Sequence, residues 1–137
     1  MEQNNPKFSV AIIGIIFNPS TKKILIGRRE NDPLLPKLTW CFPSGHAIIG
    51  EDVDKTLKDG VKEKTGLIIK NLGAIFSKTY PEKEDLLGVY FLCESFEGEE
   101  KVGGSFKELK WVDPEELENY FTTSFHKKLK EFLLELK

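Results

Sequence analysis

Apolar residues repeat with two different spacings along this chain, and these spacings predict where strands and helices lie. Residues 8–17 (FSVAIIGIIF) are almost continuously apolar and rich in β-branched side chains, which favours a central strand covered on both faces. Turn-forming residues from Asn18 onward lead to a second strand at 23–28, so the two strands are predicted to form a hairpin. Residues 40–42 favour a short apolar strand that ends at Pro43.

A helix is predicted over residues 52–65. Val53, Leu57 and Val61 recur at steps of four, which places them on one apolar face of that helix. Gly66 follows at a position where glycine commonly ends a helix.

The second half of the chain is predicted to hold further strands and then helical segments. Strands are predicted at 67–80, 86–96 and 106–112. Asp113 followed by Pro114 is typical of a helix start. A last helix is predicted from about Ser124, with an apolar face formed by Phe125, Leu129, Phe132, Leu133 and Leu136. With no repeat or linker in the sequence, the order predicts one α/β domain over residues 1–137, a mixed sheet between helices.

Composition narrows the classes of function. The 20 Lys and Arg residues and 22 Asp and Glu residues give a net charge of -2, which removes the case for a broad nucleic-acid or anionic-membrane surface. The N-terminus lacks a signal-peptide pattern, and no apolar run approaches the roughly 20 residues that span a bilayer, so a cytoplasmic protein is expected. Cys41 and Cys93 lack metal-ligand spacing, and we interpret both as small buried apolar residues.

A spaced pattern of glycines, acids and aliphatic residues fills residues 45–67. The pattern resembles the Nudix box, G-x5-E-x7-R-E-U-x-E-E-x-G-U, where U is an aliphatic residue. The agreeing positions are Gly45, Glu51, Val61, Glu63, Gly66 and Leu67. Asp59, Gly60 and Lys64 stand where the family has Arg, Glu and Glu.

The resemblance extends over nearly the whole chain. Residues 8–29 resemble the family's opening hairpin, which ends in basic residues. Residues 40–45 resemble its W-x-F-P-G-G segment, with Ser44 for the first glycine, and residues 108–117 resemble its closing strand and helix. The resemblance therefore implies the Nudix fold.

The resemblance also implies a chemistry. Family members cleave a diphosphate linked to another group, as in a nucleotide or nucleotide sugar, with an attacking water and Mg²⁺ or Mn²⁺. Glutamates at three box positions supply oxygen ligands, and these positions correspond to Gly60, Glu63 and Lys64. Gly60 offers no ligand, and the ammonium of Lys64 opposes a divalent ion unless it acts as a counter-charge for phosphates.

The candidate catalytic residues are Glu63, Glu51 and Asp59. Asp59 lies four residues before Glu63 on about the same side of the predicted helix, so a displaced carboxylate pair, with Glu51, is one way to keep a metal site. Glu63 and Glu51 are the candidate metal ligands. Each also has a plain interpretation, Glu63 as a solvated helix residue and Glu51 as an acid beside the helix dipole.

The candidate substrate-binding residues are Arg28, Arg29, Ser44, Gly45 and His46. The two arginines offer charge to a phosphate, although a strand end ordinarily exposes such residues to solvent. His46 follows the glycine loop of the motif, where a ligand contact and a plain surface histidine are both consistent with the sequence.

Two hypotheses of function follow from the altered box. One is a pyrophosphohydrolase of nucleoside-diphosphate-linked compounds with weak or rearranged metal chemistry, and the other is an inactive nucleotide-binding or regulatory module. A purely structural interaction domain is a third. Because specificity in this family lies in loops, here 30–37, 80–85 and 97–105, the box does not identify the substrate. Many relatives dimerise, so a homodimer is also an expectation.

Overall fold

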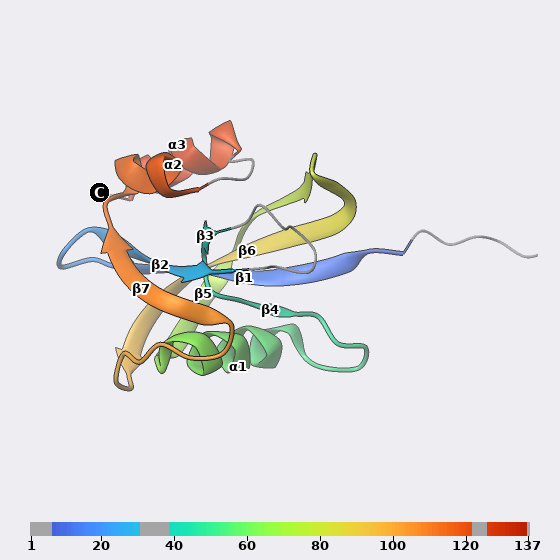
Figure 1. Ribbon diagram of the computed structural model, residues 1–137, viewed down its shortest axis with the longest axis horizontal. Coiled ribbons are helices and arrows are strands. Elements are labelled where there is room, and N and C mark those ends of the chain that lie inside the picture. The colour runs from blue at the N-terminus through green and yellow to red at the C-terminus, as the bar shows by residue number, and fades with distance from the viewer. Residues whose placement is uncertain (1–6, 31–38, 122–125, 137) are drawn as a thin grey trace, which may run out of the picture.

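A mixed β-sheet lies between helices in the computed structural model, which describes residues 7–30, 39–121 and 126–136 (Figure 1). The elements are β1 (Ser9–Asn18), β2 (Lys23–Arg29), β3 (Trp40–Cys41), β4 (Ser44–His46), α1 (Val53–Thr65), β5 (Ile68–Tyr80), β6 (Lys83–Glu97), β7 (Phe106–Val112), the 3-10 helix η1 (Pro114–Glu116), α2 (Leu117–Tyr120) and α3 (Lys127–Glu135). α1 covers one side of the sheet, whereas α2 and α3 lie on the other (Figure 1). This arrangement confirms the predicted α/β class.

β1 is the central strand of the sheet. It runs parallel to β6 from Ser9, opposite Leu86, to Ile16, opposite Cys93, and it pairs antiparallel with β4 on its other side. The predicted β1–β2 hairpin is confirmed only beside its turn, where Phe17 pairs with Ile24. Beyond that point β2 leaves β1 and pairs with β7.

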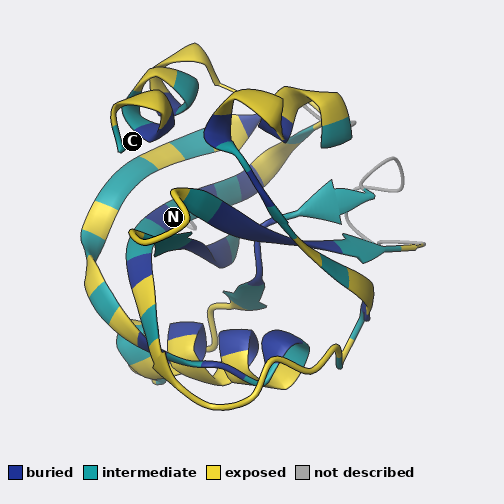
Figure 2. Ribbon diagram, turned by 90° about the vertical axis from the view of Figure 1, so that its left-hand side faces the viewer, coloured by how far each residue is buried: buried dark blue, intermediate teal, exposed yellow. Residues whose placement is uncertain are grey.

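Alternating side chains of β1 fill two separate cores. Ile12 and Ile16 face α1 and join an aliphatic cluster with Leu57 and Val61. Ile13 and Ile15 face the opposite side and join an aromatic-rich cluster beneath α2 and α3. The buried side of α1 faces the sheet and its outer side is exposed (Figure 2). The continuous apolar run thus confirms the predicted double coverage of the first strand.

The structure corrects several predicted details of the elements. Val53 is 42% exposed, because it lies in the first turn of α1 beyond the edge of the core that Leu57 and Val61 enter. Residues 44–46, expected as a glycine loop, form β4 because β1 supplies hydrogen-bonding partners. The helix start at Asp113 is a 3-10 turn, and the Asp113 side chain makes no capping hydrogen bond.

The last helix begins later than predicted. α3 starts at Lys127, where Nδ1 of His126 accepts a hydrogen bond from the backbone N–H of Lys128, so this histidine acts as an N-cap. Leu129 and Leu133 are buried as predicted, whereas Phe125 and residues 31–37 of the loop predicted at 30–37 lie outside the described residues.

The cysteines differ in burial. Cys93 is buried as expected, and burial raises the pKa of its thiol to about 12, whereas Cys41 is only half-buried. Within the described ranges, no helix is long and apolar enough to cross a membrane.

Candidate functional site

The box segment brings β4 and α1 into backbone contact. A Cβ added at Gly45 would lie 2.8 Å from the carbonyl oxygen of Thr56, and one added at Gly60 would lie 2.8 Å from the carbonyl oxygen of Ser44. Real Cβ atoms do not approach other atoms so closely, so each position requires glycine unless the helix moves. Glycines at both positions therefore let α1 rest directly on β4.

Lys64 connects the same two elements through its side chain. Its Nζ donates to the carbonyl oxygen of Ser44 at 2.5 Å and lies 5.7 Å from the centre of the Phe106 ring. The side chain is half-buried, so the ammonium is held inside the contact rather than in open solvent. A cation thus occupies the box position at which the sequence motif leads one to expect a glutamate.

A glycine-rich loop closes the C-terminal end of α1. Gly66 ends the helix in the left-handed conformation, with its N–H bonded to the carbonyl of Lys62. In the loop between β6 and β7, the N–H groups of Lys101 and Gly103 donate to the carbonyls of Thr65 and Lys64. The last four carbonyl groups of a helix lack partners within the helix, and the loop supplies partners for two of them.

The same loop contacts the last strand of the sheet. Glu100 Oε1 accepts a hydrogen bond of 2.6 Å from the indole N–H of Trp111 in β7. This bond gives Glu100 a structural role, and Trp111 packs against the aliphatic core.

Two of the three candidate carboxylates of the box share a partner, because Lys55 Nζ also lies 3.8 Å from Glu51 Oε1. Asp59 forms an ion pair of 2.6 Å with Lys55, and this hydrogen bond raises the pKa of Lys55. Glu51 accepts a hydrogen bond from Thr56 Oγ1 at 3.1 Å, and Glu63 is exposed. They form no group that could hold a metal ion, and neither do any three His, Cys, Asp or Glu residues elsewhere in the described part of the chain.

The two candidate arginines sit at the end of β2. Arg28 bonds to Glu108 at 3.1 Å and to Glu30 at 3.0 Å, and these hydrogen bonds raise the pKa of its guanidinium. Its charge is thus already balanced by two carboxylates. Arg29 is half-buried at a register shift between β2 and β7, and its backbone N–H donates to the carbonyl of Thr39. A phosphate contact from either residue stays a prediction.

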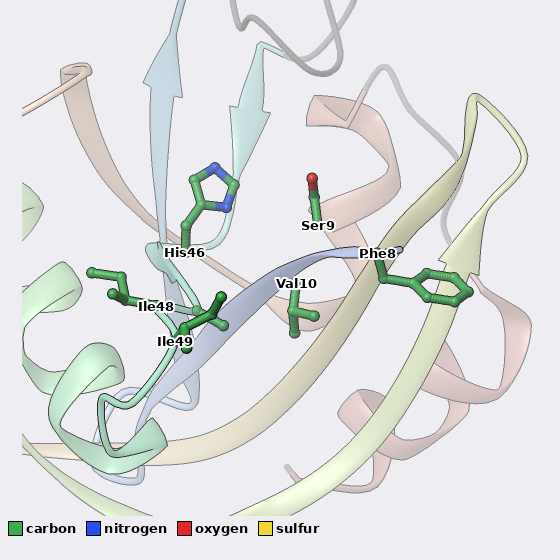
Figure 3. A pocket seen from close by; sticks show the side chains of 7 residues that line it. Phe8, Ser9, Val10, His46, Ile48 and Ile49 are labelled. Atoms are coloured by element: carbon green, nitrogen blue, oxygen red, sulfur yellow. The ribbon is translucent and has the colours of Figure 1, made fainter. Parts of the chain in front are cut away.

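A pocket of about 620 Å³ opens beside the loop that joins β4 to α1. It is lined by Phe8, Ser9, Val10, His46, Ala47, Ile48 and Ile49. Figure 3 shows Ser9 and His46 pointing to one side of β1 and Val10 to the other, with Ile48 and Ile49 entering from the loop. A hydrogen bond of 2.9 Å from the Ala47 N–H to the Val10 carbonyl ties this loop to β1.

Comparison with known proteins places this geometry in a family. The model of the NUDIX domain matches residues 7–135. The chain belongs to the Nudix family. The matched residues include the pocket lining and the box helix, and therefore every candidate residue named above.

Individual relatives of this Nudix chain carry names of nucleotide hydrolases. It is 32% identical over 110 residues to an ADP-ribose pyrophosphatase of Methanocaldococcus jannaschii, a match that covers 77% of this chain and 62% of the relative. It is 28% identical over 93 residues to the nucleoside triphosphatase NudI of Escherichia coli, covering 59% of this chain and 66% of that protein. The chain therefore spans less than two thirds of the length of these relatives.

Solved structures share the Nudix fold at low sequence identity. A NUDIX hydrolase from Nitrosomonas europaea superposes with a TM-score of 0.77 at 16% identity, covering 96% of this chain and 73% of that one. An ADP-ribose pyrophosphatase from Streptococcus suis gives a TM-score of 0.68 at 20% identity, covering 96% of this chain and 89% of that one. These likenesses confirm the predicted fold.

Nudix hydrolases generally use divalent cations, and the donor set of this Nudix box does not fit one. Gly60 has no side chain, the Lys64 ammonium lies in the contact, and among the described residues Glu63 belongs to no group of three or more acids, histidines or cysteines that could hold a metal ion. Asp59, the candidate for a displaced carboxylate pair with Glu63, is already ion-paired with Lys55, which competes with metal binding by that carboxylate.

Sequence reasoning missed the contribution of β1 to the pocket. Phe8, Ile48 and Ile49 are large apolar residues that stay exposed. The signal available in the sequence was the adjacent pair Ile48 and Ile49 in the segment between β4 and α1, because two large apolar residues that are left exposed outside the core suggest a binding surface.

Proposed function

We propose that this Nudix chain binds a nucleoside diphosphate linked to a further group, such as ADP-ribose or a nucleotide sugar. We further propose that it hydrolyses the diphosphate far more slowly than a family member with a complete box. The ligand class is supported by the full-length family match and by the relatives named as ADP-ribose pyrophosphatases. One observation carries the slow hydrolysis: Lys64 occupies a family glutamate position, with its ammonium on the Ser44 carbonyl.

The pocket supplies a place for the nucleoside end of such a ligand. Its lining is largely apolar, which suits a base or ribose ring, and His46 and Ser9 add polar groups that can fix orientation. β4 connects the pocket to Lys64, because His46 lies at one end of this strand and Ser44 at the other. A strand rises about 3.3 Å per residue, so the two residues are roughly 7 Å apart, within reach of one nucleotide.

Residual hydrolysis would depend on Glu63. This exposed carboxylate keeps its family position and can accept a proton from an attacking water. General-base help of this kind typically contributes about 10²–10⁴-fold to a rate, well below what an enzyme with further electrostatic stabilisation reaches. A box reduced to Glu63 therefore supports slow turnover.

A second candidate function is a nucleotide-binding module that performs no hydrolysis. The packing of Gly60 against the Ser44 carbonyl favours it, because no added acid fits there without moving the helix. The two candidates differ only in whether Glu63 contributes to turnover.

The test combines binding with product release. ADP-ribose and nucleotide sugars are titrated calorimetrically, and AMP or nucleoside monophosphate release is followed in Mg²⁺ or Mn²⁺ for the parent chain and for Glu63→Gln. We expect saturable binding by both and slow release that Glu63→Gln lowers further. Glu131→Gln, an exposed acid on α3, is the matched control and should behave as the parent.

Each other outcome has a definite meaning. Absence of binding across the compounds would contradict the proposed ligand class. Fast release that depends on metal and disappears in Glu63→Gln would contradict impaired hydrolysis. Binding without release above the uncatalysed background in either protein would establish the non-hydrolysing module. Equal release above that background would contradict the role of Glu63.

A further inference from the structure

Two box substitutions meet at one atom, the carbonyl oxygen of Ser44. The Lys64 ammonium donates to this oxygen, and the missing side chain of Gly60 leaves room for it 2.8 Å from where a Cβ would stand. The substitutions are four residues apart, hence neighbours on one face of α1. The two substitutions therefore act together. Gly60 lets α1 approach the backbone of β4, and Lys64 donates a hydrogen bond to the Ser44 carbonyl at that contact.

Lys64 provides a hydrogen-bond donor for the carbonyl of Ser44. Ser44 pairs with Ile13 of β1, and its carbonyl faces α1 in a half-buried contact where a polar group requires a partner. A hydrogen bond from a charged donor is about twice as strong as a neutral one, and the ring of Phe106 at 5.7 Å further stabilises the ammonium. The chain itself thus provides a cation at this carbonyl.

The surroundings of Lys64 show what a change of charge would do. The Glu63 carboxylate and the Lys64 side chain both lie close to Gly104, each 3.3 Å from the position of an added Cβ. A carboxylate in place of the lysine would therefore stand near Glu63 and the Ser44 carbonyl, three oxygen-bearing groups without a cation. Such a cluster is unfavourable unless a divalent ion joins it.

We infer that Lys64 is a built-in cation of the box, which positions the Ser44 carbonyl and the loop that follows it without a divalent metal. The folded box, and the ligand binding proposed above, are then independent of Mg²⁺ and Mn²⁺. Lys64 is a positioning residue in this scheme. The statement about the box stands on the contacts alone, and the statement about ligand binding rests on the proposed function.

The first experiment measures melting temperature without nucleotide, in excess EDTA and in excess Mg²⁺ or Mn²⁺. The parent chain should melt at the same temperature in all conditions. Lys64→Glu should melt lower in EDTA by about 5 °C or more and recover when Mn²⁺ is added. Lys64→Arg should keep most of the parent stability, and Lys64→Gln, which keeps a donor without charge, should lie between.

Lys62→Gln is the matched control, because it removes the same charge from an exposed residue of the same helix. It should leave the melting temperature unchanged. The inference would be overturned if Mg²⁺ or Mn²⁺ raised the melting temperature of the parent chain as much as that of Lys64→Glu. It would also be overturned by a Lys64→Gln variant as stable as Lys62→Gln, a comparison that holds even if Lys64→Glu does not fold.

The second experiment separates this inference from the proposed function. The Kd of ADP-ribose should change by less than about twofold between EDTA and Mg²⁺ in the parent chain. Lys64→Gln should raise this Kd about tenfold in both solutions. A parent chain that binds only with Mg²⁺ would contradict metal independence. If no protein binds ADP-ribose, the proposed ligand fails while the melting experiment still decides the role of Lys64.

Discussion

Two regions of the box segment differ in how tightly they are packed: a closed end, where α1 contacts β4, and an open end, the loop between β4 and α1. At the closed end, Gly45, Gly60 and Lys64 bring α1 against the backbone of β4 with no space for another atom. At the open end, Ile48 and Ile49 face solvent beside the pocket. Both differences in glutamate positions, at Gly60 and Lys64, lie at the closed end. The altered box is therefore a repacked contact, whereas the open end is where a ligand can be accommodated.

The largest expected effect comes from opening the closed end. Gly60→Ala should destabilise the protein by about 2 kcal/mol, because its Cβ would meet the Ser44 carbonyl and the Gly45 nitrogen at under 3.0 Å. In an ordinary helix the same change would stabilise by about 1 kcal/mol. Urea unfolding measures the difference in free energy of unfolding between Gly60→Ala and the parent. The sign of that difference shows whether the contact between α1 and β4 is as tight as described.

Gly50→Ala is the companion variant at the open end. A Cβ there meets nothing within 4 Å, but Gly50 has a φ of 83°, so only backbone strain of about 1–2 kcal/mol is expected. Stabilisation by Gly60→Ala would remove the contrast between the two ends.

A smaller effect is expected at the pocket. Ile48→Ser should change the free energy of unfolding by less than about 0.5 kcal/mol, since the side chain is 59% exposed. It should raise the Kd of ADP-ribose about fivefold, roughly 1 kcal/mol, because it removes apolar surface from the pocket lining. Calorimetry measures both proteins. Leu72→Ser on β5, a comparably exposed apolar residue outside the pocket, should leave Kd unchanged, and equal effects of the two variants would refute a ligand site here.

The smallest effect concerns the first turn of α1. Asp54 bonds to Lys58 and to Asn71 of β5, and these hydrogen bonds lower the pKa of its carboxyl group. A lowered pKa in the folded state means that the stabilisation is present above the usual carboxyl pKa and is lost as the pH falls through the lowered value. Asp54→Asn should therefore cost at most about 0.5 kcal/mol near neutral pH and nothing in strong acid.

Unfolding of both proteins across acid pH tests this, with Glu94→Gln on β6 as a control for the loss of one negative charge. A stability gap between parent and Asp54→Asn that widens toward acid would contradict the assignment.

The sequence predicted what depends on local pattern. The apolar run of β1, the Leu57 and Val61 stripe and the Gly66 helix end each follow from spacing within one element, and the structure confirms them. The ion pair of Asp59 with Lys55 also had a visible signal, because four residues separate them on one helix. The predicted pairing of Asp59 with Glu63 did not take this spacing into account.

What the sequence could not predict depends on contacts between distant segments. β4 exists because β1 offers its edge to a segment some 30 residues away, and no local pattern in Ser44, Gly45 and His46 indicates a strand. The hydrogen bond from Lys64 to Ser44 joins residues 20 positions apart and follows from the packing of α1 on two glycines. Family register located these residues, and only the packing gives Lys64 a partner.

The bond between Trp111 and Glu100 gives this protein an optical reporter of its own box. The loop that carries Glu100 also holds the last carbonyls of α1, so an indole in β7 is coupled to the seating of that helix. Trp40, the other tryptophan, stacks edge-on against Tyr120 on the opposite side of the sheet. Replacing Trp40 with phenylalanine leaves Trp111 as the single tryptophan. Its emission wavelength should then report displacement of the box helix without any added label.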